Sequence, residues 1–162
     1  MLLNLLISAL ISSAACITVG GLEVTEDNRT WVSVLTDQGT AKAALEIFET
    51  SDTGKGFSSP VLTISPEGKA VIGGSLKADR KGEILLFYTL TEGYYDGKGE
   101  IFMRRCPINE PTKWSEPVRV GTGCVHSAPV ITDKGTIILP ASIWGAYCTD
   151  PAYLHNLSET RQ

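Results

Sequence analysis

The side chains that are best suited to chemistry fall in stretches expected to be loops. Tyr94, Tyr95 and Asp96 follow one another between two glycines, and an aromatic wall beside a carboxylate suits the binding of a sugar. His126 stands at the start of an expected strand, where it could contact a ligand, and Asp37 lies in the loop sequence Asp-Gln-Gly. The alternatives are a solvated loop flanked by glycine for the two tyrosines and an ordinary loop residue for Asp37.

The composition argues against two other kinds of function. The net charge is −4, whereas binding to phosphates needs a basic face. The four cysteines lack the spacing of metal ligands, and neither histidine lies near a Cys-x-x-Cys pair. We therefore expect no nucleic-acid partner, no metal and no cofactor.

The elements that must position these residues are expected to be short strands. Sixteen glycines and eight prolines, without a long amphipathic helical run, predict an all-β protein. The stretch 84–88 is apolar throughout, so both of its faces should be covered. The expected strands are residues 31–35, 44–49, 61–64, 73–77, 84–88, 100–105, 118–120, 127–131 and 137–140.

A tight turn is predicted across residues 50–60, between two of these strands. Asp52 can accept hydrogen bonds from backbone N–H groups, and Gly54 and Gly56 can adopt left-handed conformations. Phe57 would then pack back under the turn. The order Ser/Thr-x-Asp-x-Gly-x-x-aromatic resembles the Asp-box, the repeat of sialidases and related β-propellers.

Two internal repeats support a repetitive architecture. Residues 57–61 recur as 114–118, and residues 79–86 recur as 132–139, in each case after a little more than fifty residues. This spacing suits one four-stranded propeller blade with its loops.

The repeats and their flanks resemble the BNR-repeat sialidase-like family over roughly residues 31–145. The sequences that carry the resemblance are residues 82–88, 113–117, 127–130 and 135–140. The resemblance implies a six-bladed β-propeller that hydrolyses terminal sialic acid or related glycosides. The chain has the length of two blades and part of a third, so we expect a partial propeller. A fragment is favoured over a truncated gene product or one part of an oligomeric propeller.

The strand directions of a propeller blade place the candidate residues. Loops between the second and third strands, and the links between blades, lie on the top face, whereas Asp-box turns such as that of Asp52 lie on the opposite face. Asp37 then occupies the loop where sialidases carry their acid/base aspartate, which needs a pKa raised by burial. The resemblance assigns substrate binding to Lys77, Tyr94, Tyr95, Asp96 and His126, with Trp144 and Tyr147 also on the top face.

The arginines argue against activity in the isolated chain. Sialidases hold the substrate carboxylate with three arginines, and the usual Phe/Tyr-Arg-Ile-Pro motif is absent. None of the arginines is expected to reach the top centre, and the Tyr–Glu nucleophile pair of the family cannot be assigned. The alternative functions are a non-catalytic Asp-box segment that binds carbohydrate or protein and a structural remnant.

The two ends of the sequence differ from the middle. Residues 1–16 resemble a signal peptide, and the segment that ends at Cys16 resembles a lipobox, which implies a secreted, periplasmic or cell-surface protein. The alternative is a buried strand pair over residues 7–19. The apolar run is too short to span a bilayer. Residues 17–148 are expected to form the blades and residues 149–162 a polar tail. After export Cys124 and Cys148 could pair, whereas Cys106 should stay free.

Overall fold

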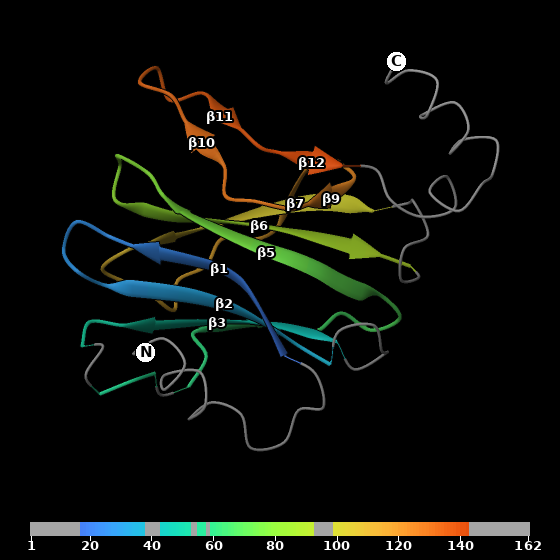
Figure 1. Ribbon diagram of the computed structural model, residues 1–162, viewed down its shortest axis with the longest axis horizontal. Coiled ribbons are helices and arrows are strands. Elements are labelled where there is room, and N and C mark those ends of the chain that lie inside the picture. The colour runs from blue at the N-terminus through green and yellow to red at the C-terminus, as the bar shows by residue number, and fades with distance from the viewer. Residues whose placement is uncertain (1–16, 38–42, 53–54, 58, 93–98, 143–162) are drawn as a thin grey trace, which may run out of the picture.

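The computed structural model describes residues 17–37, 43–52, 55–57, 59–92 and 99–142, and all the regular structure among them is β-strand (Figure 1). This confirms the expected all-β fold. The strands are β1 (Ile17–Val24), β2 (Thr30–Thr36), β3 (Ala44–Thr50), β4 (Leu62–Ile64), β5 (Ala70–Ala78), β6 (Glu83–Thr91), β7 (Glu100–Pro107), β8 (Val118–Thr122), β9 (Cys124–Val125), β10 (Val130–Ile131), β11 (Ile137–Ile138) and β12 (Ala141–Ser142).

The strands form two sheets of the same design and two smaller pairs. The first sheet has the order β1-β2-β3-β4 and the second has the order β5-β6-β7-β8, and every neighbouring pair is antiparallel. β10 pairs with β11, and β9 pairs with β12. In Figure 1 the first sheet, the second sheet and the pairs β9–β12 and β10–β11 follow one another as successive layers.

The strand β1 is an element that the sequence did not predict. It precedes the expected first strand and pairs with β2 from Ile17↔Thr36 to Val24↔Thr30. Its register shifts between Val19 and Gly21, at a pair of glycines. The last residues of the expected strand pair 7–19 belong to β1, and the rest lie outside the described residues.

One turn geometry connects the first two strands of each sheet. In the β1–β2 turn, the backbone N–H of Thr25 donates to Arg29 O (2.9 Å) and that of Asn28 donates to Thr25 O (2.9 Å). The Arg29 N–H donates to the Thr25 hydroxyl (3.1 Å), and Asn28 is left-handed with φ +63°.

The same bonds recur in the β5–β6 turn, from Asp79 to Glu83, and in the β10–β11 turn, from Thr132 to Thr136. Gly82 and Gly135 take the left-handed position, each with φ +79°. The predicted repeat of 79–86 as 132–139 is therefore a repeat of structure, and residues 25–29 are a third copy.

Hydrophobic cores lie between the layers, on both faces of β6. Tyr88, Ile84 and Leu86 are buried against residues of the first sheet such as Trp31 and Leu45. From the other face, Leu85 and Phe87 are buried with Ile101 and Val125, and Ile131 and Ile137 of the β10–β11 pair pack on them. Because successive strand residues point to opposite faces, the apolar run of β6 serves two interfaces. The prediction that both faces of residues 84–88 are covered is confirmed.

Close contacts join the layers where β5 passes β1 and β2 on one side and β9 on the other. The Ser33 hydroxyl donates to Gly74 O at 2.5 Å, where the register of β5 shifts between Ile72 and Ser75. A Cβ added to Gly21 would lie 2.8 Å from Gly74 O, and one added to Gly73 would lie 2.8 Å from Val125 O. Glycine therefore lets β1, β5 and β9 approach one another more closely than side chains would allow.

Candidate functional site

The sheets have two distinct ends. The loops after β2 and β6 leave one end, marked by Thr36, Thr91 and Glu100, which we term the loop end. The three repeated turns lie at the opposite end, which we term the turn end. The first and second sheets share this orientation, because the N–H of Ala78, next to the β5–β6 turn, donates to Glu23 Oε1, next to the β1–β2 turn (3.1 Å). The third layer follows it, because the N–H of Gly123, just before β9, donates to Gly99 O (2.8 Å) at the loop end.

Asp37 lies at the loop end. It directly follows β2, its backbone is left-handed with φ +49°, and its side chain is half-buried. A non-glycine residue in this conformation is uncommon, and aspartate is among the residue types that tolerate it best. The remainder of the β2–β3 loop, residues 38–42, lies outside the described residues.

A cleft at the loop end was not predicted. It has a volume of about 330 Å³, and its walls come from the end of β6, the start of β7, the strand β8 and the connection before β5. The residues that line it are Lys69, Leu90, Thr91, Glu92, Gly99, Glu100, Arg119 and Thr122. Tyr94, Tyr95 and Asp96, which were predicted to bind substrate, come between β6 and β7 in the sequence and lie outside the described residues.

The cleft carries charged groups of both signs. The Nε of Arg119 lies 2.7 Å from Glu100 Oε1 in an exposed ion pair, and Lys69 and Glu92 are further charged groups on its walls. Such groups can hydrogen-bond sugar hydroxyls from opposite sides. No sequence motif predicts the loop-end cleft, because the residues that line it come from separate elements.

His126 follows β9 and is exposed. Its Nε2 lies 2.5 Å from Ser142 Oγ, on the partner strand β12. The N–H of Val125, its neighbour, donates to the Thr89 hydroxyl at 3.1 Å, two residues before the loop end of β6. His126 therefore belongs to the third layer and lies toward the loop end.

Lys77 was predicted to bind substrate with these residues, and its placement is a correction. It pairs with Leu85 close to the β5–β6 turn, so it lies near the turn end. Its Nζ is 2.9 Å from Glu23 Oε1, an atom that also accepts the N–H of Ala78 at 3.1 Å. Because β5 runs from the loop end to the turn end, a residue near its end lies far from the β6–β7 loop.

The arginines of the described part do not gather into a carboxylate clamp. Arg29 pairs with Asp27 and Glu49, Arg80 with Asp133, Arg105 with Glu83 and Arg119 with Glu100. Arg104 donates to the Ser115 carbonyl at 3.0 Å. Arg119 lies on β8, which is an outer strand as expected, and it also lines the loop-end cleft. Arg161 lies outside the described residues.

The predicted Asp-box turn lies at the turn end, after β3. The N–H of Asp52 donates to the Thr50 hydroxyl (3.1 Å), and the N–H of Lys55 donates to Asp52 O (3.0 Å). The Phe57 ring packs edge-on against Phe48 with centroids 6.2 Å apart. These contacts agree with a structural role for this turn.

The cysteines have contrasting positions. Cys106 is a free, fully buried thiol, and burial raises its pKa to about 11. It is therefore protonated at neutral pH and unsuited to nucleophilic chemistry. Cys124 is also buried, but Cys148 lies outside the described residues, so a bond between the two stays a prediction.

Among the described residues, no cluster of His, Cys, Asp and Glu side chains could hold a metal ion. The described segments also contain no helix with the length and hydrophobicity of a membrane span. No protein-family model matches the sequence, and no curated protein matches it.

Proposed function

We propose that this chain is a partial sialidase-like β-propeller whose loop end acts on terminal sialic acid or related glycosides. The observation that carries the proposal is the repetition of one unit. Two four-stranded antiparallel sheets with the same strand order pack face to face, and the β1–β2 turn recurs in the second and third layers. Propeller blades repeat radially in this way.

In this proposal Asp37 is the general acid that protonates the leaving oxygen of the glycoside. It directly follows β2 at the loop end, and it is only half-buried. The cleft at the same end of the sheets, with Glu92, Glu100 and Arg119 on its walls, would bind sugar hydroxyls. His126 would contact the ligand from the third layer.

Hydrolysis of a fluorogenic sialoside tests the catalytic part of the proposal. Replacement of a general acid typically lowers the rate by about 10²–10⁴-fold, so Asp37→Asn should remove most of the turnover. Asp52→Asn is the matched control, because Asp52 is an exposed aspartate at the turn end, and it should leave the rate unchanged. Equal loss of activity in both variants would contradict the assignment of Asp37.

A second candidate function is carbohydrate binding without hydrolysis. It is favoured by the arginines, because those at positions 29, 80, 105 and 119 are each paired with a carboxylate. An arginine that is already paired is less available to a substrate carboxylate. Binding on a glycan array without release of a fluorescent aglycone would support this second function over the first.

A further inference from the structure

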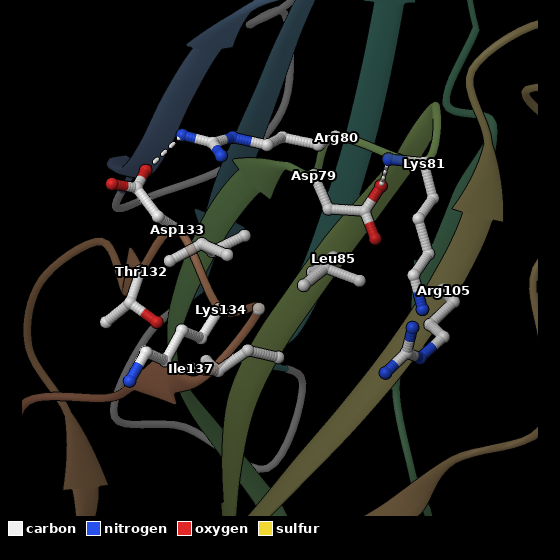
Figure 2. Close-up of a pocket in the computed structure, with 11 residues that line it drawn as sticks. Asp79, Arg80, Lys81, Leu85, Arg105, Thr132, Asp133, Lys134 and Ile137 are labelled. Carbon is white, nitrogen blue, oxygen red and sulfur yellow. Dashed lines mark hydrogen bonds and ion pairs between the residues drawn. The ribbon is translucent and has the colours of Figure 1, made fainter.

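A second cleft lies at the turn end, between the β5–β6 turn and the β10–β11 turn (Figure 2). Its volume is about 370 Å³, which is within the range of roughly 300–1,000 Å³ for small-molecule sites. Its charged residues come from three elements: the two turns, which are copies of one another, and β7, which contributes Arg105. The proposed glycosidase function does not use this end of the molecule.

The charge of this cleft is opposite to that of the whole chain. Four cationic side chains line it, namely Arg80, Lys81, Arg105 and Lys134, against the two carboxylates of Asp79 and Asp133. The chain as a whole has a net charge of −4. Cations gathered in a cleft raise the local concentration of anions.

The two carboxylates are already engaged. Asp79 Oδ1 accepts the backbone N–H groups of Lys81 (2.8 Å) and Glu83 (3.0 Å), so it maintains the turn. Asp133 pairs with Arg80 at 2.6 Å. That ion pair is largely exposed, and exposed pairs are weak. Arg105 is also paired, with Glu83 Oε2 at 3.1 Å, so an anion in the cleft would compete with Asp133 for Arg80 and with Glu83 for Arg105.

The two lysines are the most available cations. Neither Lys81 nor Lys134 forms an ion pair within the described part of the chain, and both side chains are exposed. Figure 2 shows the Lys81 side chain running along the cleft toward Arg105, with Lys134 on the opposite turn. An anion between the turns would thus meet positive charge from both sides.

An apolar surface lies between these cations. Leu85 is buried beneath the cleft, and Ile131 and Ile137 of the β10–β11 pair are partly exposed beside it. A bare inorganic ion would make no use of this surface. It suits the carbon skeleton of an ester, whose charged group could then reach the lysines and arginines.

We propose that this cleft binds a tetrahedral oxyanion ester, a sulfate or phosphate group carried on a small organic body such as a sugar. Guanidinium and ammonium groups from three elements would surround the anionic oxygens, since arginine and lysine both bind such groups well. The ester body would rest on Leu85, Ile131 and Ile137.

Calorimetric titration with glucose 6-phosphate, glucose 6-sulfate and glucose tests this site. The charged sugars should bind saturably, more weakly at high salt, whereas glucose should not bind. The stronger of the two charged probes identifies the ester. In the double variant Lys81→Gln/Lys134→Gln the affinity should fall by about tenfold or more, because two charge-assisted hydrogen bonds to the anion are lost.

The matched control is the double variant Lys55→Gln/Lys113→Gln, which removes the same charge from exposed lysines outside the cleft. It should bind the charged sugars as the unmodified chain does. Two results would overturn the proposal: no saturable binding of either charged sugar, or an equal loss of affinity in both double variants. All four lysines are exposed, so the variants should fold, and thermal unfolding checks this.

Discussion

The ring of Trp114 lies edge-on against the ring of Trp31, with centroids 6.0 Å apart and an interplanar angle of 81°. Trp31 is a fully buried residue of β2, whereas Trp114 comes from the connection between β7 and β8. The contact therefore joins the second sheet to the first. Trp114 belongs to the sequence 114–118 that repeats residues 57–61. Its counterpart Phe57 packs instead on Phe48 of the first sheet, so only the second copy of the aromatic joins two sheets.

Truncation of Trp114 should destabilise the fold. Trp114→Ala removes a partly buried ring and its edge-to-face contact, and we expect a loss of about 2–4 kcal/mol in the free energy of unfolding. Trp114→Phe should lose less than half of that, because the indole N–H has no hydrogen-bond partner among the described residues. Urea unfolding measures both variants. Similar losses for both would show that the ring contact is not the source of the stability.

A second contact between the sheets is the hydrogen bond from Ser33 to Gly74. Both residues are buried, so Ser33→Ala leaves the Gly74 carbonyl without this donor in a dry environment. We expect a loss of about 1–3 kcal/mol in the free energy of unfolding. Ser51→Ala, at an exposed position, should change it by less than about 0.5 kcal/mol. An unchanged unfolding midpoint for Ser33→Ala would show that the bond does not hold the sheets together.

The buried thiol of Cys106 predicts a dependence of stability on alkaline pH. Burial raises its pKa from 9.0 to about 11, so the folded state holds the proton more tightly than the unfolded state does. The resulting stabilisation is complete below about pH 9 and is lost as the pH rises from 9 toward 11.

Urea unfolding of the chain and of Cys106→Ala at pH 7 to 11 measures this effect of pH. Other groups titrate in the same range, so the informative quantity is the difference between the two proteins. We expect the stability advantage of the unmodified chain to shrink above about pH 9. A difference that stays constant to pH 11 would contradict the buried, protonated thiol. Alkylation of Cys106 should likewise require unfolding.

Much of the fold could be predicted where the sequence pattern reports packing directly. The apolar run of β6 predicted two covered faces, because only a strand buried on both sides lacks polar alternation. The turn before Phe57 could be predicted from its glycines and its aromatic residue. The repeat of the turns at Gly82 and Gly135 was visible because the same residue types recur.

Other parts could not be predicted, for identifiable reasons. β1 carries Gly20 and Gly21, where its register shifts, and its apolar residues Val19, Leu22 and Val24 are exposed. The first copy of the repeated turn has Asn28 in the left-handed position, where the other two copies have glycine. Its backbone geometry is therefore the same, but its residues do not match the other copies closely enough to be recognised as a repeat. Lys77 was wrongly grouped with the loop-end residues, although the expected strand 73–77 already ends just before the repeated sequence 79–86 and Lys77 pairs with Leu85 beside that turn.

The charged clefts are the least predictable features. Lys69 and Arg119 meet at the loop-end cleft although they lie on separate connections and strands. Arg80 and Asp133 meet at the turn-end cleft because two repeated turns lie side by side. Only the packing of the layers brings these residues together, and packing between layers leaves no local pattern in the sequence.

The central claim is that the loop end of the sheets receives the glycan. Amide chemical shifts of the isotope-labelled chain, recorded during titration with N-acetylneuraminic acid and a neutral galactoside, test it most directly. The account predicts saturable shifts at Asp37, Thr91, Glu100 and their neighbours. Shifts confined to the turn end, around Asp52 and Lys77, or the absence of any saturable shift with either sugar, would contradict it.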